Sequence, residues 1–163
     1  MIANKQTNGK EVTSIFLADD HEMIRRFIKR LLKKEVDLCV VGEAANGLDA
    51  AQMVANLKPD ILITDLSMPG LDGIEVTRRV RQSSPKTMVI VLSMWNPSRY
   101  AEEAKKAGAF TYMIKDSAIN DLVPAIRAAI DHRRNGNSQS PESTPKAPSL
   151  DAMGDDIRKG DIK

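Results

Sequence analysis

Charged residues stand at the ends of three short apolar runs, and together they have the chemistry to bind a cation and a phosphoryl group. In chain order they are Asp19 and Asp20 after the run 15–18, Asp65 after the run 61–64, and Lys115 after the run 110–114. If the runs are parallel strands of one sheet, three carboxylates and one ammonium group meet at one edge. Carboxylates that lie so close repel one another unless a cation neutralises them. The set therefore predicts a site for a divalent cation and a phosphoryl group.

Each of these residue types has a distinct use in phosphoryl transfer. Asp65 is the candidate nucleophile, because a carboxylate can form an acyl phosphate. Asp19 and Asp20 are candidate ligands for Mg²⁺, which binds a few carboxylates together with water and phosphate oxygens. Lys115 is expected to pair with the phosphoryl group, and Ser93, at the end of a fourth apolar run, to donate a hydrogen bond to it. Phosphoryl transfer needs mainly positioning and charge neutralisation, which these residues can supply.

Short apolar runs alternate with longer amphipathic ones along the chain. Strands are expected over 14–18, 38–43, 61–65, 88–93 and 110–114, and helices over 22–34, 48–57, 73–83, 99–107 and 120–133. Five successive strand–helix units predict a doubly wound (βα)5 α/β fold, a flavodoxin-like three-layer sandwich with parallel sheet order 2-1-3-4-5. In that order the first and third strands are neighbours, which would bring Asp19, Asp20 and Asp65 together.

Single positions also carry structural expectations. Helical periodicity turns Phe27 of the first helix and Met53 of the second toward the sheet. Cys39, the only cysteine, lies in an apolar run and is expected in the core. Pro124 is tolerated only near a first turn, so the last helix is not expected to begin much before residue 120.

Composition and length set the broad class. The chain has 163 residues, 42% of them hydrophobic and 28% charged, as in soluble globular proteins. No apolar run approaches the ~20 residues of a membrane helix, no secretory signal is recognisable, and one cysteine excludes an internal disulfide, so we expect a cytoplasmic protein. The net charge of +2 is too small to indicate nucleic-acid binding. We expect a disordered extension over 1–12, one domain over 13–134, and a disordered tail or linker remnant over 135–163.

Over about residues 13–134, the motifs resemble the receiver domain of response regulators in two-component signalling. The matching features are Asp19-Asp20-His21, the stretch 65–73, Ser93, and the segment from Gly108-Ala109 through Tyr112 to Lys115. The resemblance implies that a histidine kinase or phosphotransfer protein phosphorylates Asp65, which identifies a signalling switch rather than a turnover enzyme. It also implies Mg²⁺ bound by Asp19, Asp20, Asp65 and the backbone carbonyl of Ser67. Ser93 and Tyr112 would be the switch pair, and we expect His21 to be a solvent-facing loop residue.

The same resemblance directs output to the fourth helix, fifth strand and fifth helix, through a homodimer or a partner protein. The first motif and the Lys115-Asp116 pair look most like regulators that carry a C-terminal helix-turn-helix, and the tail contains no such domain. Nucleic acid is therefore expected as a partner only if a C-terminal domain is missing. Met94 follows Ser93 where the family often has a smaller residue, which predicts restricted access and slower dephosphorylation.

Three other classes of protein are compatible with parts of this pattern. An aspartyl-phosphate phosphatase of the haloacid-dehalogenase type resembles it in fold and nucleophile, but normally has a second Asp where this chain has Ser67. A flavodoxin-like flavin carrier needs hydroxyls and amides in its first loop, where Asp19 and Asp20 would repel a phosphate. A truncated DNA-binding transcription regulator shares the receiver chemistry and differs only in its output.

Overall fold

A five-stranded parallel sheet forms the centre of the computed structural model, which describes residues 6–7, 10–94, 98–116 and 118–136. The strands of this sheet are β3 (Thr13–Ala18), β4 (Leu38–Ala44), β5 (Ile61–Asp65), β6 (Met88–Ser93) and β7 (Thr111–Ile114). Their order is β4-β3-β5-β6-β7, so the predicted order 2-1-3-4-5 is confirmed. The first and third strands of the sheet are therefore neighbours, as the site requires.

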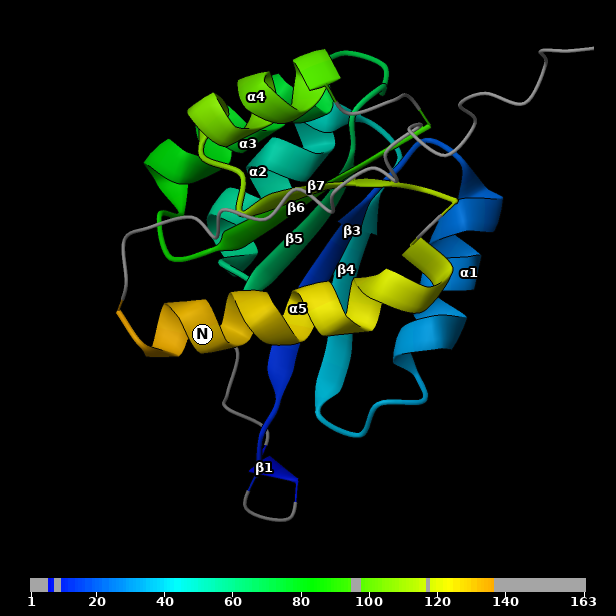
Figure 1. Ribbon diagram of the computed structural model, residues 1–163, viewed down its shortest axis with the longest axis vertical. Coiled ribbons are helices and arrows are strands. Elements are labelled where there is room, and N and C mark those ends of the chain that lie inside the picture. The colour runs from blue at the N-terminus through cyan, green and yellow to red at the C-terminus, as the bar shows by residue number, and fades with distance from the viewer. Residues whose placement is uncertain (1–5, 8–9, 95–97, 117, 137–163) are drawn as a thin grey trace, which may run out of the picture.

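Helices cover both faces of this sheet. They are α1 (Glu22–Leu32), α2 (Gly47–Leu57), α3 (Gly73–Ser83), α4 (Ser98–Ala107) and α5 (Ala118–Arg134). Figure 1 shows α1 and α5 on one side of the sheet and α2, α3 and α4 on the other. The predicted doubly wound three-layer sandwich is thus the fold of the chain.

Alternation along the strands divides the interior into two cores. In β3, Ile15 and Leu17 face α1 and α5, whereas Phe16 and Ala18 face the opposite three helices. Successive side chains of a strand point to opposite faces, so a strand buried on both faces must be apolar throughout. Burial on both faces explains why the apolar runs of the sequence are continuous. It also means that packing on both sides of the sheet supports the strand ends.

Three expectations about individual side chains are wrong. Phe27 is 41% exposed and Met53 is 37% exposed, because the buried stripes run through Ile28 and Leu32 in α1 and through small residues in α2. Cys39 is exposed rather than buried, since it lies on the edge strand β4.

The last helix begins earlier than expected, at Ala118, so that Pro124 lies inside it. Proline has no N–H to donate to the carbonyl of Asn120, four residues before it. The loss falls in the second turn, and burial of Leu122 and Ile126 against the sheet offsets it.

At the amino end of the chain, residues that we expected to be disordered form a short pairing. Gln6–Thr7 (β1) pairs in antiparallel fashion with Lys10–Glu11 (β2). The predicted tail falls almost wholly outside the described residues.

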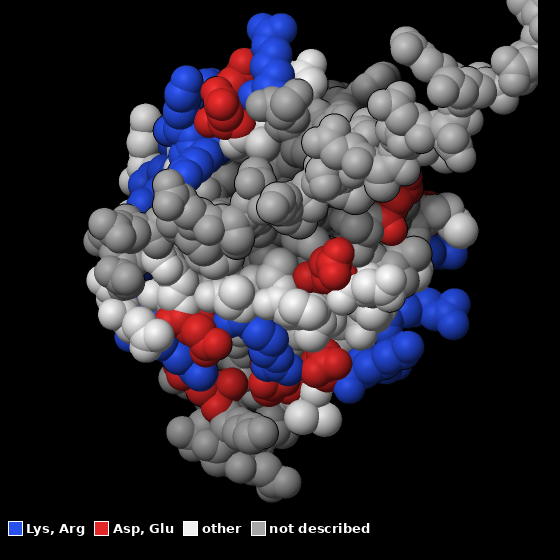
Figure 2. Space-filling view, in the orientation of Figure 1, with Lys and Arg blue, Asp and Glu red and all other residues white. Residues whose placement is uncertain are grey.

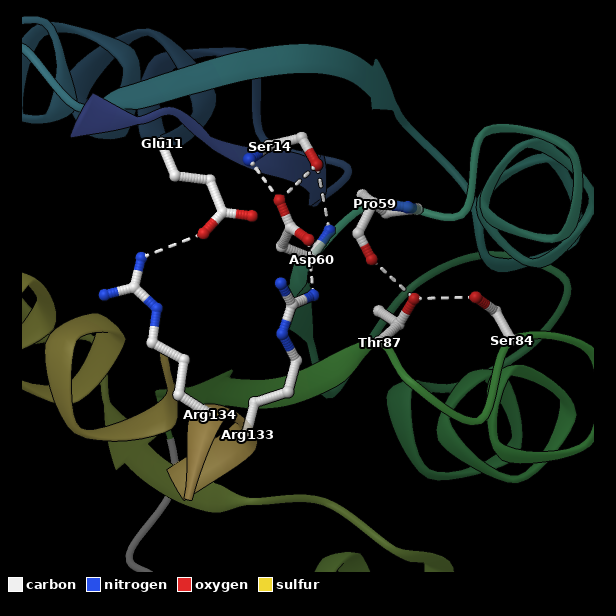
Figure 3. Close-up of polar contacts among 8 residues, drawn as sticks. All are labelled: Glu11, Ser14, Pro59, Asp60, Ser84, Thr87, Arg133 and Arg134. Atoms are coloured by element: carbon white, nitrogen blue, oxygen red, sulfur yellow. Dashed lines mark hydrogen bonds and ion pairs between the residues drawn. The ribbon is translucent and has the colours of Figure 1, made fainter. Parts of the chain in front are cut away.

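Arginines of α5 bind the rim of the sheet opposite the predicted site. Arg133 pairs with Asp60, whose other oxygen accepts hydrogen bonds from the backbone and hydroxyl of Ser14 at 2.7 and 2.8 Å. Arg134 reaches Glu11 at 3.3 Å (Figure 3). Figure 2 shows acidic and basic side chains intermingled along this lower rim. These pairs fix the end of α5 to segments that are distant in sequence.

Candidate functional site

The acidic residues and the lysine lie at the carboxyl edge of the sheet. Ala18 pairs with Thr64, and Ser93 pairs with Ile114, so β3, β5, β6 and β7 end at one level. The next residues after two of these strands are Asp19 and Lys115, and Asp65 ends β5. The parallel register therefore brings the predicted residues together.

Lys115 bridges two buried carboxylates. Its Nζ lies 2.7 Å from Asp19 Oδ2 and 3.1 Å from Asp65 Oδ2, and all three side chains are at most 5% exposed. One ammonium group thus faces two carboxylates in a region with little water. Such a site carries excess negative charge, which a cation would balance.

Burial controls the protonation of Asp65. Removal from water raises the pKa of this carboxyl, the Lys115 ammonium opposes that effect, and the charge of Asp19 adds to it. The Ser67 N–H also donates a hydrogen bond to the carboxylate, which favours the ionised form. The net result is that the pKa of the Asp65 carboxyl is raised. Keeping this buried carboxyl ionised therefore costs free energy.

Asp20 and His21 extend the cluster toward solvent. Asp20 has a side chain 32% exposed, and its Oδ1 lies 2.9 Å from His21 Nδ1. The same nitrogen lies 3.3 Å from Asp19 Oδ1. One ligand atom from each of Asp19, Asp20, His21 and Asp65 can be chosen so that all lie within 4.8 Å of one another.

The loop after β5 is held against the strand by a close glycine contact. A Cβ at Gly73 would meet the carbonyl oxygen of Asp65 at 2.2 Å, so only glycine fits there. The Gly73 N–H donates to Leu66 O at 2.8 Å, and the Asp72 side chain caps α3 by accepting from Glu75 N. Ser67 is exposed in this loop, and its carbonyl as a metal ligand stays a prediction.

Ser93 and Tyr112 are in contact beneath the site. Ser93 is fully buried at the end of β6, and Tyr112 lies on the neighbouring strand β7. Burial raises the pKa of the Tyr112 hydroxyl, and a hydrogen bond with the Ser93 side chain partly opposes this effect. The Tyr112 ring packs against the core under α2, α3 and α4. The two predicted switch residues are thus joined, while their movement stays a prediction.

Two residues near the carboxylates make contacts that the sequence did not indicate. His21 is 64% exposed, as expected for a loop residue, but its ring nitrogen faces both first-loop aspartates. Arg25 Nη1 donates to the backbone oxygen of Asp19 at 2.6 Å and so fixes the loop. The only signal for Arg25 was its place one turn into the following helix.

The donor set fits a hard divalent cation. Asp19 Oδ2 is buried and contacts Lys115 at 2.7 Å, yet accepts no well-aligned hydrogen bond from the residues that the structure describes. Asp20 and Asp65 offer further carboxylate oxygens within reach. Oxygen atoms of this kind are the ligands that Mg²⁺ prefers.

The sequence matches the family model described as the response regulator receiver domain over residues 15–127. Since this covers more than half of its length, the chain belongs to the receiver family of two-component systems. It is 36% identical over 122 residues to the nitrate/nitrite response regulator NarL of Escherichia coli K12, covering 75% of this chain and 56% of the relative. It is 34% identical over 120 residues to the response regulator GacA of Pseudomonas aeruginosa, covering 74% and 56%. The chain spans about half the length of the curated relatives it matches.

Solved structures agree with this assignment. A LuxR-family response regulator from Aurantimonas sp. SI85-9A1 superposes with a TM-score of 0.71 at 36% identity, covering 75% of this chain and 87% of that one. The isolated receiver domain of RcsB from Salmonella enterica serovar Typhimurium, solved with the phosphomimetic BeF3⁻, gives 0.69 at 28% identity, covering 80% and 94%. These relatives are response regulators, not phosphatases or flavin carriers. Among the described residues, no helix combines the length and apolarity needed to cross a bilayer.

Proposed function

We propose that Asp65 is the phosphoacceptor of a two-component signalling pathway and that a histidine kinase or histidine phosphotransfer protein is its donor. An oxygen of the Asp65 carboxylate attacks phosphorus, the P–N bond of the phosphohistidine breaks, and the departing imidazole nitrogen takes a proton. The observation that carries this proposal is the contact of a buried Asp65 carboxylate with Lys115 at 3.1 Å. Asp19 also is buried against Lys115, but it lies in the loop after β3, whereas Asp65 is the last residue of the central strand β5.

The surrounding residues divide the remaining work. Lys115 is held between Asp19 and Asp65, from which it can pair with a phosphoryl oxygen while staying close to the nucleophile. Asp19, Asp20 and Asp65, with the Ser67 carbonyl, would hold Mg²⁺, which when bound supplies positive charge to the phosphoryl oxygens. The chain thereby assists its own phosphorylation and dephosphorylation without turning over a small-molecule substrate.

Signal output would begin at the Ser93–Tyr112 contact. A phosphoryl group adds about −1.5 to −2 charges at Asp65. The Ser93 hydroxyl has one hydrogen to donate, so when it donates to this group it can bond to Tyr112 only as an acceptor. The Tyr112 ring would then move, and the surface of α4, β7 and α5 would change for a partner protein or a second copy of the chain.

A second candidate output is transcription control. A relative from Bacillus subtilis that is 38% identical is described as an uncharacterized transcriptional regulatory protein, and this chain covers 51% of it. We infer that a DNA-binding domain, if joined to this receiver in a longer protein, would be controlled by the same switch. Either output places the protein in the cytoplasm, where a kinase could reach it.

Intact-mass spectrometry with acetyl phosphate and Mg²⁺ tests the proposal. One phosphoryl adduct is expected on the wild-type chain and none on Asp65→Asn, with Asp72→Asn as a control on an aspartate that caps α3. An adduct that persists in Asp65→Asn would overturn the assignment.

A further inference from the structure

The side chain of His21 faces the acidic cluster at the start of α1. His21 is the N-cap residue of α1, with φ −89° and ψ 106°, yet its side chain makes no capping hydrogen bond. Its ring is largely exposed and therefore not held by packing. Instead Nδ1 lies 2.9 Å from Asp20 Oδ1 and 3.3 Å from Asp19 Oδ1.

We propose that His21 is a nitrogen ligand of the divalent-cation site and makes that site prefer transition-metal ions such as Co²⁺, Ni²⁺ and Zn²⁺ over Mg²⁺. The inference rests on the proposed cation site at Asp19, Asp20 and Asp65. It adds a residue to that site and changes which ions the site selects.

The separations of the atoms match those between neighbouring ligands of one ion. Ligands at about 2.1 Å from an ion lie about 3.0 Å apart in octahedral and about 3.4 Å apart in tetrahedral geometry. The two observed separations from His21 Nδ1, 2.9 and 3.3 Å, fall at these values. The imidazole nitrogen and one oxygen of each aspartate therefore lie close enough together to serve as ligands of one ion.

The loop that carries His21 is already fixed. The His21 backbone N–H donates to Asp19 Oδ1 at 2.8 Å, and Arg25 Nη1 donates to the Asp19 carbonyl at 2.6 Å. Ligands that are oriented in advance bind metal at a smaller entropic cost. These contacts fix the Asp19 carboxylate and the backbone from which the His21 ring extends.

Imidazole selects among divalent ions because of its electronic character. It suits Co²⁺, Ni²⁺ and Zn²⁺, whereas Mg²⁺ takes oxygen ligands and water. Carboxylates alone discriminate less between these ions. A nitrogen donor beside Asp19 and Asp20 should thus add affinity for transition metals and little for Mg²⁺.

A simpler role for His21 makes the opposite prediction. If the protonated ring only pairs with Asp20, as Lys115 pairs with Asp65, it must be displaced by any entering cation. Removing it would then strengthen binding of every divalent ion by a similar factor. The two roles are therefore distinguished by whether removing His21 strengthens or weakens ion binding, and by whether the effect differs between ions.

Calorimetric titration of the full chain with Co²⁺ and with Mg²⁺, at mildly alkaline pH, distinguishes these outcomes. His21→Ala is expected to weaken Co²⁺ binding about tenfold or more and to change Mg²⁺ binding less than about twofold. His21→Asn keeps a polar side chain beside Asp20 and should lose Co²⁺ affinity in the same way. His132→Ala is the matched control, because it removes the only other histidine, whose ring packs on Phe110 at a centroid distance of 5.4 Å.

Three results would overturn the inference. Equal changes for both ions, or tighter binding of both in His21→Ala, would reduce His21 to a neighbouring charge. The same Co²⁺ loss in His132→Ala would assign the nitrogen ligand elsewhere. If the wild-type chain bound neither ion, the proposed function would fail together with this inference. If instead the wild type binds Mg²⁺ and is phosphorylated at Asp65, but His21→Ala leaves Co²⁺ affinity unchanged, only this inference fails.

Discussion

Asp60 immediately precedes strand β5 and Asp65 is its last residue, and their carboxyl pKa values shift in opposite directions. Burial would raise the pKa of Asp60, but hydrogen bonds from Ser14 and the charge of Arg133 outweigh it and lower the pKa. At Asp65, burial prevails over Lys115 and raises the pKa. A stabilising carboxylate thus lies just before the strand, and a carboxylate that is costly to ionise lies at its carboxyl end. This contrast is expected if the first has a structural role and the second a chemical one.

Replacing the costly carboxylate should stabilise the fold. Asp65→Asn is expected to raise the free energy of unfolding by about 1 kcal/mol at neutral pH, the size typical of a stabilising change at a functional site. A raised folded pKa means that Asp65 imposes no cost below its unfolded pKa of about 3.9 and a growing cost as the pH rises through the folded value. The gain should therefore vanish in acid. Urea unfolding of both proteins across this pH range measures it, and a destabilised Asp65→Asn at neutral pH would contradict the electrostatic account.

Replacing the stabilising carboxylate should have the reverse effect. Asp60→Asn keeps the size of the side chain but loses charge-assisted hydrogen bonds, at a cost of about 2 kcal/mol at neutral pH. Since the folded pKa of Asp60 is lowered, its contribution is present above the unfolded pKa and is lost as the pH falls through the folded value. The deficit should shrink in acid. The same urea series tests this, and a deficit that is independent of pH would point to packing instead of charge.

Lys115 is expected to be essential for stability when no metal is bound. Lys115→Ala leaves two buried carboxylates without their ammonium partner, which should cost about 3 kcal/mol. Adding Mg²⁺ should restore part of that loss by supplying a second positive charge. Thermal unfolding with and without Mg²⁺ measures both effects, with exposed Lys106→Ala as the control. Equal stability of Lys115→Ala and the wild type without Mg²⁺ would contradict the role of the bridge.

Gly73 should be intolerant of even one methyl group. In Gly73→Ala the new Cβ would overlap the Asp65 carbonyl, a backbone atom that cannot move aside cheaply. We expect a loss of about 2 kcal/mol in the free energy of unfolding and slower phosphorylation of Asp65. Gly136→Ala, where the Cβ meets nothing within 4 Å, should cost less than about 1 kcal/mol despite its positive φ. If both variants unfolded alike, the close contact would have no energetic weight.

The sheet and the meeting of the charges could be predicted because both follow from order along the chain. Apolar runs such as 61–64 mark buried strands, and a parallel sheet places their final residues at one edge. Helix faces were less predictable. Phe27 and Met53 fit the helical period but lie at the margin of the buried stripe, where one position decides between core and solvent.

Contacts between residues that are brought together only by the folded chain could not be predicted from the sequence. The pairing of Arg133 with Asp60 joins residues 73 positions apart, and nothing local indicates it. The orientation of His21 toward two aspartates depends on the loop geometry at the start of α1. The predicted order 2-1-3-4-5 already puts the strand of Cys39 at the edge of the sheet, but an apolar run does not show which side chains of an edge strand stay open to solvent.

The most direct test of the central claim is a ¹H–¹⁵N NMR titration of the full chain with beryllofluoride and Mg²⁺. If Asp65 is the phosphoacceptor of a switch, amide shifts should spread from Asp65 to Ser93, Tyr112 and α4, and should disappear in Asp65→Asn. Shifts confined to the loop of Asp19 and Asp20, or unchanged in Asp65→Asn, would contradict it.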